Sequence, residues 1–254
     1  MSIATASKLN RLLSENIPGG LLFATWLRKA GYSSQLLKKY RDSGWLEMLV
    51  RGVMYRSNDN LSAVAAVCSY TRQTGNSARI AAHSALELLG FNHYVPMGKP
   101  RLMVAFKSGS IDEWAKSDKY DMTIVPFHTG VFKNPATQLI ARNGNSLTIS
   151  SPEQAFLECL YLVPDHYNYM DLYYIMEQLT ALDPEKVQTA LENTSSQRVK
   201  RMFLYMAEKA GHYWFDMIDK EKLGLTGSKM QLVENGAYIS KYRITVPKEL
   251  NDYE

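Results

Sequence analysis

The chain of 254 residues has little of what secreted or membrane proteins usually contain. It has only two cysteines, Cys68 and Cys159, and neither belongs to a metal or redox spacing, so both are typical of reduced core residues. The first ten residues, MSIATASKLN, are polar and lack the hydrophobic centre of a secretory leader. The most apolar run, residues 155–163, contains Glu158 and is too short to cross a bilayer. We therefore expect a cytoplasmic protein with no membrane partner.

Motifs that carry catalysis are also missing from the sequence. The five histidines are scattered without the spacing of metal ligands. The segment GLTGSK at 224–229 lacks the glycine-lysine-hydroxyl ending of a P-loop, and the chain has no nucleophile elbow. A restriction-type nuclease needs an acidic-x-lysine triplet to hold its metal, and no lysine here has an acidic residue two positions before it. These absences predict a protein that is not an enzyme and that uses no metal or cofactor.

Positive charge is concentrated at the beginning of the chain. Residues 1–60 contain nine basic and four acidic side chains, a net charge of +5, so the remaining residues carry −1 of the total of +4. An apolar content of 46% is ordinary for a protein with a buried core. The asymmetry indicates a small basic module that meets an acidic polymer, joined to a nearly neutral body. The polar segment SNDNLS at 57–62 predicts the joint, and we expect domains at 1–58 and 59–254.

The basic module has the turn signals of three helices. Ser7 is suited to cap a first helix, which NIPGG at 16–20 ends. A second helix around FATWLRKAG ends at Gly31, and SSQLLKKYRDSG at 33–44 predicts a third helix that Ser33 or Ser34 caps. A helix, a short glycine-containing turn and another helix form the helix-turn-helix pattern. The following residues 45–56 predict two short strands around Arg51-Gly52, which is the wing of a winged helix-turn-helix domain.

The third helix separates into an apolar and a polar face. Leu36, Leu37 and Tyr40 share one side and are expected to pack inward. Serine and glutamine near the start of such a helix suit the edges of bases, and lysine and arginine suit phosphates. The predicted DNA contacts are Ser33, Ser34, Gln35, Lys38, Lys39, Arg41 and, on the wing, Arg51. Two alternatives remain open: an ordinary solvated helix face, or a winged helix that binds another protein.

The body has a mixed α/β pattern in which helices outnumber strands. Strands are predicted at 101–106, 122–127, 137–142 and 146–150, and helices at 61–73, 78–91, 152–163, 169–179, 184–193 and 197–210. Glu234-Asn235-Gly236 predicts a turn between two strands near the end of the chain. The fold class is therefore α+β, or mixed, with a winged helix-turn-helix module and a larger α/β domain.

The predicted helix at 197–210 carries a second group of basic residues. Its apolar stripe leaves four cationic side chains on other faces: Arg198, Lys200, Arg201 and Lys209. Such a group is either a solvated surface or a patch that binds an anion or a protein.

Four segments of the sequence, taken together, resemble the AbiEi antitoxins of type IV toxin–antitoxin systems. The first is residues 12–56, which hold the predicted winged helix. The others are ISSPEQAFLECL at 149–160, VKRMFLYMAEKAGHYWF at 199–215 and residues 223–247. The turn departs from the family pattern at Tyr32, where a smaller aliphatic residue is expected.

The resemblance implies a bacterial protein with two roles in phage defence. Its winged head would bind repeats in the promoter of its own operon and repress it, with the contacts falling on the helix and wing residues named above. Its larger domain would counter a nucleotidyltransferase-like toxin, without needing a stable complex. The basic helix falls in that domain, and its residues Arg198, Lys200, Arg201 and Lys209 are the predicted toxin-counteracting surface. A DNA-targeted nuclease and a ligand-sensing transcription factor remain the alternatives.

Overall fold

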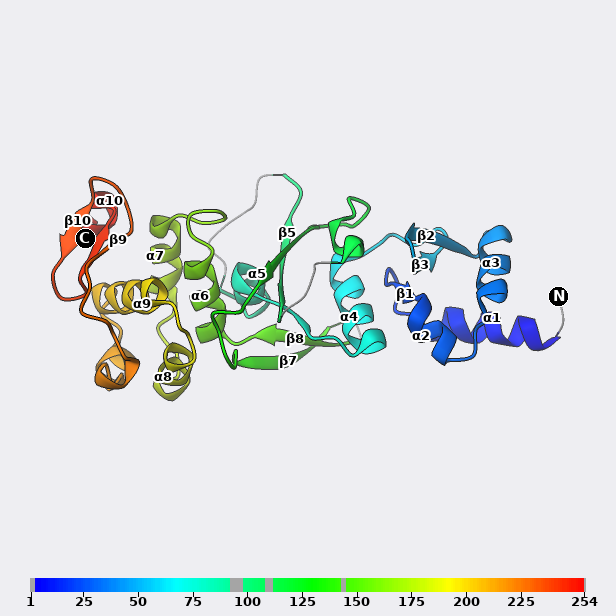
Figure 1. Cartoon of the computed structure of the whole chain (residues 1–254), viewed down its shortest axis with the longest axis horizontal. Helices are drawn as coiled ribbons and strands as arrows, with labels where there is room; N and C mark the ends of the chain where they lie inside the picture. The colour runs from blue at the N-terminus through cyan, green and yellow to red at the C-terminus, as the bar shows by residue number, and fades with distance from the viewer. Residues whose placement is uncertain (1–2, 92–97, 108–111, 143–144, 254) are drawn as a thin grey trace. The chain divides into compact units, whose positions relative to one another are not determined.

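The computed structural model describes residues 3–91, 98–107, 112–142 and 145–253 (Figure 1). The fold is mixed α and β and forms two compact units. One comprises Met1–Ile80, Pro96–His128 and Leu139–Thr148, and the other comprises Ala81–Val95, Thr129–Gln138 and Ile149–Glu254. These units do not coincide with the predicted domains 1–58 and 59–254, because the chain after residue 58 supplies a helix and a sheet to the first unit.

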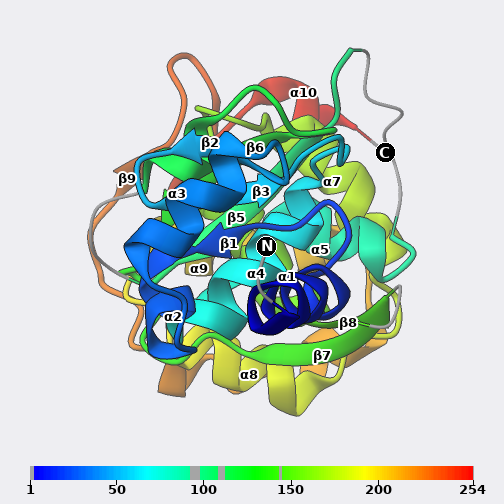
Figure 2. The same ribbon diagram turned by 90° about the vertical axis from the view of Figure 1, so that its right-hand side faces the viewer.

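The first unit begins with a winged helix-turn-helix (Figure 2). Three helices, α1 (Ile3–Glu15), α2 (Ala24–Lys29) and α3 (Ser34–Asp42), accompany an antiparallel sheet with the order β1-β3-β2. The strands are β1 (Leu22–Phe23), β2 (Leu46–Val50) and β3 (Val53–Arg56). The three helices, the turn and the wing agree with the prediction. The start of the first helix does not, because α1 already includes Ser7 and begins four residues earlier.

The core of the winged helix forms because each element has one apolar face. Leu27, Leu37 and Tyr40, from the two helices that flank the turn, are at most 3% exposed. They pack with buried residues from the other elements: Leu9, Leu12, Leu22, Tyr32, Leu46 and Met54. The helical spacing of apolar residues along α3 therefore determines which side of the helix packs in the core and which side faces solvent.

Helix α4 (Ala63–Thr74) is tied to the winged helix by side-chain hydrogen bonds. The amide of Gln73 accepts from the Phe23 N–H at 2.8 Å and donates to the Leu21 carbonyl at 2.7 Å. The Ser69 hydroxyl accepts from the Leu21 N–H at 3.0 Å. Phe23 also meets Tyr70 of this helix, with their ring centroids 5.7 Å apart. These contacts make α4 part of the first unit.

A five-stranded sheet, most of whose residues belong to the first unit, has the order β6-β5-β4-β8-β7. Its strands are β4 (Ala78–Ile80), β5 (Arg101–Phe106), β6 (Thr123–His128), β7 (Thr137–Arg142) and β8 (Asn145–Ser150), and the 3-10 helix η1 (Glu113–Lys116) lies between β5 and β6 in the sequence. Four strands lie where the sequence predicts them. Ala78–Ile80 was predicted as helix but is a strand, because it pairs antiparallel with β5.

The second unit is mainly helical, with α6 (Pro152–Tyr161) packed against four other helices. These are α5 (Ala82–Leu88), α7 (Tyr169–Gln178), α8 (Pro184–Glu192) and α9 (Gln197–Lys209). The elements that follow are η2 (Tyr213–Met217), η3 (Glu221–Leu223), β9 (Met230–Gln231), β10 (Ala237–Ile239), β11 (Ile244–Val246) and α10 (Lys248–Asp252). The predicted turn at 234–236 is present, but the strands beside it do not pair with each other, since β11 lies between them.

A buried carboxylate fixes the start of the helical layer. Glu158 of α6 is fully buried and accepts hydrogen bonds from the Ala82 N–H at 3.0 Å and from the Ser150 hydroxyl at 2.9 Å. Gln154 donates to its other oxygen at 3.1 Å. Ala82 has a positive φ of 48°, an uncommon conformation for a residue with a side chain. The segment 149–160 therefore has a structural role in this unit, with its polar side chains turned inward.

Candidate nucleic-acid interface

The N-terminus of α3 is capped as the sequence predicts. Ser33 has extended backbone angles, and its hydroxyl accepts a hydrogen bond from the Leu36 N–H at 3.1 Å. This bond satisfies one of the free amides of the first turn, and the helix dipole places partial positive charge at this end. The end of α3 that the prediction assigns to base and phosphate contacts is therefore well ordered and electropositive.

Four of the predicted DNA contacts share the outer face of α3. Ser34, Gln35, Lys38 and Lys39 are all exposed, whereas Leu37 and Tyr40 hold the opposite side in the core. Neither lysine forms an ion pair or a side-chain hydrogen bond with any residue that the structure describes. Both ammonium groups are thus available to an anionic partner without first breaking an internal contact.

Arg41 lies at the edge of that face rather than in its centre. The side chain is half-buried, and its Nη1 lies 3.7 Å from the Met54 sulfur on β3. The contact places the end of α3 beside the sheet of the wing. Arg41 as a DNA contact remains a prediction, and its guanidinium is held more firmly than the two lysines.

The wing is a tight hairpin with a basic tip. Gly52 has a φ of 83°, which favours glycine, and its carbonyl accepts from the Ala24 N–H at 2.8 Å. Arg51 next to it is exposed and has no ion-pair partner within residues 3–91. At the base of the hairpin, the Tyr55 hydroxyl donates to Glu47 at 2.5 Å and accepts from Lys119 at 3.2 Å. The side chain at the tip is therefore exposed to solvent, whereas hydrogen bonds hold the base of the hairpin.

Other exposed residues of the head were not assigned a role from the sequence. Arg28 and Lys29 are exposed in the last turn of α2, directly before the turn that leads to α3. Trp45 and Met48 are each 45% exposed, which is unusual for large apolar side chains. The sequence alone places these two basic residues beside the predicted helix-turn-helix turn, and this position was a signal for candidate contacts to DNA.

The basic side chains of α9 form hydrogen bonds within the protein. Lys200 is 7% exposed and Arg201 only 1%, so the prediction that they lie on outer faces of the helix is wrong. The Arg201 guanidinium donates to the carbonyls of Thr226 and Ser228, the latter at 2.7 Å, and Lys200 donates to the Leu223 carbonyl at 2.6 Å.

The other two basic residues of α9 are half-buried. Arg198 donates to the carbonyls of Tyr161 and Val163, each at 2.7 Å, and Lys209 donates to those of Asn251 and Tyr253. Segments distant in the sequence thus cover α9, which helical periodicity alone does not reveal. The assignment of the four residues to a toxin-facing surface remains a prediction.

Among the residues that the structure describes, no three histidine, cysteine or acidic side chains gather as a metal site would require. Over the same ranges, none of the helices has the length and apolar character needed to span a membrane.

The N-terminal elements place the chain in the winged helix-turn-helix class, with an exposed, cationic outer face on α3. Residues 5–97 match the family described as "Transcriptional regulator, AbiEi antitoxin N-terminal domain". Residues 104–247 match "Transcriptional regulator, AbiEi antitoxin, Type IV TA system". The protein therefore belongs to the AbiEi antitoxin family of type IV toxin–antitoxin systems.

One solved structure supports the fold along nearly the whole chain. The RV2827C protein from Mycobacterium tuberculosis matches with a TM-score of 0.59 over 96% of this chain and 92% of its own. The two share 13% sequence identity, so the likeness concerns the fold alone. No curated protein matches the chain.

Proposed function

We propose that the winged helix binds double-stranded operator DNA with repeats upstream of its own operon and represses that operon. The observation that carries the proposal is the outer face of α3, where Lys38 and Lys39 are exposed and unpaired beside a capped helix N-terminus. Arg51 at the wing tip supplies a further cation. Phosphate groups bind exposed, unpaired cations of this kind. The exposed side chains of Ser34 and Gln35 are suited to hydrogen bonds with the edges of bases.

The second half of the proposal concerns the remainder of the chain. We propose that it counters a nucleotidyltransferase-like toxin, without needing a stable complex, and that it is not itself an enzyme. Membership of the antitoxin family supports this role. Of the four predicted basic residues, Arg198 and Lys209 are the two that reach solvent, so any direct contribution of that set to the toxin falls on them.

Fluorescence anisotropy with the upstream DNA of the operon, against a shuffled duplex across a salt series, tests DNA binding. The Lys38→Ala/Lys39→Ala variant is expected to bind both duplexes more weakly. Because each phosphate contact releases about one counterion, its slope of log affinity against log salt is expected to fall by up to about 2.

The matched control is Lys186→Ala/Lys248→Ala, which removes the same charge from exposed sites of the second unit and should keep the full slope. Equal slopes for wild type and the α3 variant would contradict the assignment of these lysines. Absence of selective binding at every salt concentration would contradict operator binding itself.

A further inference from the structure

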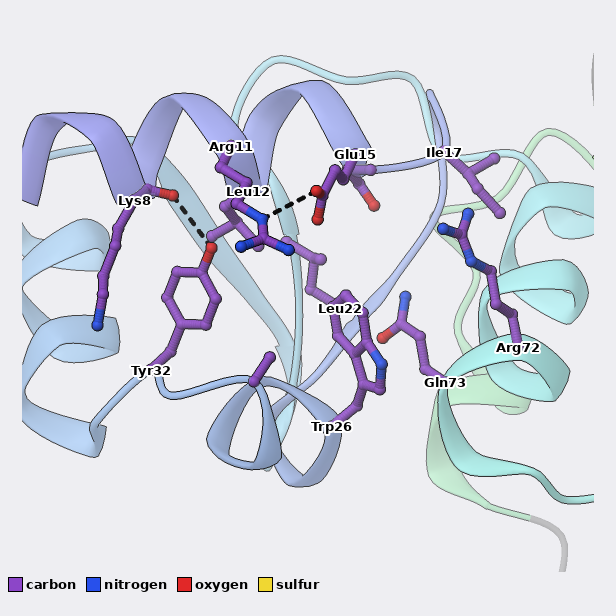
Figure 3. Close-up of a pocket in the computed structure, with 12 residues that line it drawn as sticks. Lys8, Arg11, Leu12, Glu15, Ile17, Leu22, Trp26, Tyr32, Arg72 and Gln73 are labelled. Carbon is purple, nitrogen blue, oxygen red and sulfur yellow. Dashed lines mark hydrogen bonds and ion pairs between the residues drawn. The ribbon is translucent and has the colours of Figure 1, made fainter.

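The first unit has a cavity beside the turn that leads to α3. About 190 Å³ of space is enclosed by α1, α2, α4 and the loop that precedes β1 (Figure 3). Arg11, Trp26 and Gln73 point toward one another in this space. Every residue that lines the cavity belongs to the first compact unit. The site is therefore built by the DNA-binding head and needs no part of the second unit.

The lining of the cavity has an excess of positive charge. Arg11 and Arg72 face it together with one carboxylate, Glu15, whereas the Lys8 ammonium donates to the Gly31 carbonyl at 3.1 Å. Arg11 donates through Nε to Glu15 at 2.9 Å, which leaves its two terminal nitrogens for other acceptors. Arg72 is exposed on α4 and forms no ion pair within the ranges that the structure covers. This charge balance favours an anionic ligand.

Asn16 adds unused hydrogen-bonding capacity to the same cavity. Its amide nitrogen and oxygen are both shielded from solvent, and neither has a hydrogen-bond partner in the described part of the chain. Buried amides are normally paired, and those left unpaired in native proteins often mark functional sites. Gln73 is different, because its amide is already bonded to the β1 segment. Asn16 is therefore the polar group that a bound molecule would satisfy.

The remaining lining is apolar and flat on one side. The Trp26 indole contributes an aromatic surface, and Leu12, Ile17 and Leu22 contribute aliphatic ones. The volume lies below the roughly 300 to 1,000 Å³ of sites for drug-sized ligands, so it suits a single ring. We propose that this cavity binds a small aromatic carboxylate, with its ring on Trp26 and its carboxylate toward Arg72 and Asn16.

The position of the cavity links its occupant to DNA binding. Tyr32, which also lines it, lies in the turn between α2 and α3, and its hydroxyl donates to the Lys8 carbonyl of α1 at 3.1 Å. A ligand against Trp26 and Tyr32 contacts α2 and the turn that leads to α3, and it thereby shifts the angle of α3. This consequence rests on the proposed DNA-binding function, and we infer that occupancy changes the affinity for the operator.

Benzoate is a suitable probe for the site itself. The chain has four tryptophans, so the indole N–H signals of the ¹⁵N-labelled full-length protein can be assigned with a Trp26→Phe variant. Benzoate is expected to shift the Trp26 signal with a dissociation constant in the millimolar range, as suits a ligand of about nine non-hydrogen atoms. Benzamide, which has the same ring without the charge, should bind at least tenfold more weakly.

Arginine variants test the assignment of the carboxylate. Arg72→Gln is expected to weaken benzoate binding at least tenfold, whereas Arg28→Gln, at an exposed site of α2 outside the cavity, should leave it unchanged. No saturable shift of Trp26, or equal binding of benzamide and benzoate, would overturn the site.

Fluorescence anisotropy of operator DNA, with and without saturating benzoate, then tests whether the occupied cavity changes the affinity for the operator. A change of at least threefold in operator affinity for wild type, absent in Arg72→Gln, is expected; unchanged affinity with a filled site would overturn the regulation. Failure to bind DNA at all would refute the proposed function while leaving the benzoate measurement intact.

Discussion

At the scale of single residues, Arg201 shows how a buried charge is held without a carboxylate. It is 1% exposed, and the hydrogen bonds of its guanidinium go to the carbonyls of Thr226 and Ser228, the Thr226 hydroxyl and the Arg243 carbonyl. Charge-assisted bonds of this kind are stronger than neutral ones, and they offset the loss of hydration. Arg201 therefore ties the loop before β9 to α9, which is a structural role.

Replacing Arg201 with methionine is expected to destabilise the protein. The variant keeps the volume but removes the charged donor to three backbone carbonyls and the Thr226 hydroxyl, so we expect a loss of about 3 kcal/mol in the free energy of unfolding. Urea unfolding followed by circular dichroism measures it. Lys186→Met, at an exposed site on α8, is the control that should lose little. A loss for Arg201→Met no greater than that of the control would show that its bonds do not stabilise the fold.

The residue scale also predicts a dependence on pH. Burial raises the pKa of Glu208, but hydrogen bonds from Lys241 and Tyr242 outweigh it, so the pKa lies below its ordinary value of 4.5. A carboxyl group with a lowered pKa stabilises the fold above its unfolded pKa, and this stabilisation is lost as the pH falls through the folded one. The free energy of unfolding of Glu208→Gln should therefore differ most from that of wild type above pH 4.5.

Urea unfolding at a series of pH values measures the Glu208 effect. The stability difference between wild type and Glu208→Gln is expected to shrink as the pH falls below 4.5. Glu221→Gln, at an exposed carboxylate, provides the comparison. A difference for Glu208→Gln that stays constant across the acid range would contradict the lowered pKa.

At the scale of elements, the short strand β1 depends on a side chain from another element. One edge of β1 pairs with β3, and the Gln73 amide takes the place of a neighbouring peptide for the Phe23 N–H and the Leu21 carbonyl. A two-residue strand has few ladder bonds of its own, so these two bonds are a large part of what positions it. They also attach α4 to the winged helix.

Gln73→Glu tests this bridge with almost no change in shape. The carboxylate still accepts from the Phe23 N–H, but it cannot donate to the Leu21 carbonyl, and two acceptors then face each other. We expect a loss of about 2 kcal/mol in the stability of the head at neutral pH, measured by hydrogen exchange of amides in β3. Gln35→Glu on the exposed face of α3 serves as the matched substitution. Equal exchange in the two variants would refute the role of the bridge.

The elements also show why part of the fold is readable from the sequence and part is not. The ends of α2 and α3 and the tip of the wing follow from local chemistry, since Gly31, Gly44 and Gly52 all have positive φ. The strand at 78–80 was missed because a segment of only three residues becomes a strand through its pairing with β5, which its own sequence does not reveal. The burial of Lys200 and Arg201 was missed for a similar reason, since the segment that covers them comes more than twenty residues later.

At the scale of the whole molecule, charge and architecture separate the two proposed activities. The net charge of +5 within residues 1–60 belongs to the winged helix, whereas the remaining residues are nearly neutral. The outer face of α3 has the unpaired lysines that DNA requires, and the basic side chains of α9 are bonded internally. We therefore expect the two proposed activities, repression and toxin control, to depend on different residues, so that a substitution on α3 affects only one of them.

This separation can be measured in cells that carry a reporter under the operon's own promoter and an independently induced toxin. Lys38→Ala/Lys39→Ala should lose repression, because weaker phosphate contacts leave the promoter free, while growth under toxin induction stays at the wild-type level. The control Lys186→Ala/Lys248→Ala should keep both activities. If the α3 variant loses toxin protection at unchanged protein level, the two activities share a surface on the head. In that case, the exposed face of α3 meets the toxin or its substrate as well as the operator.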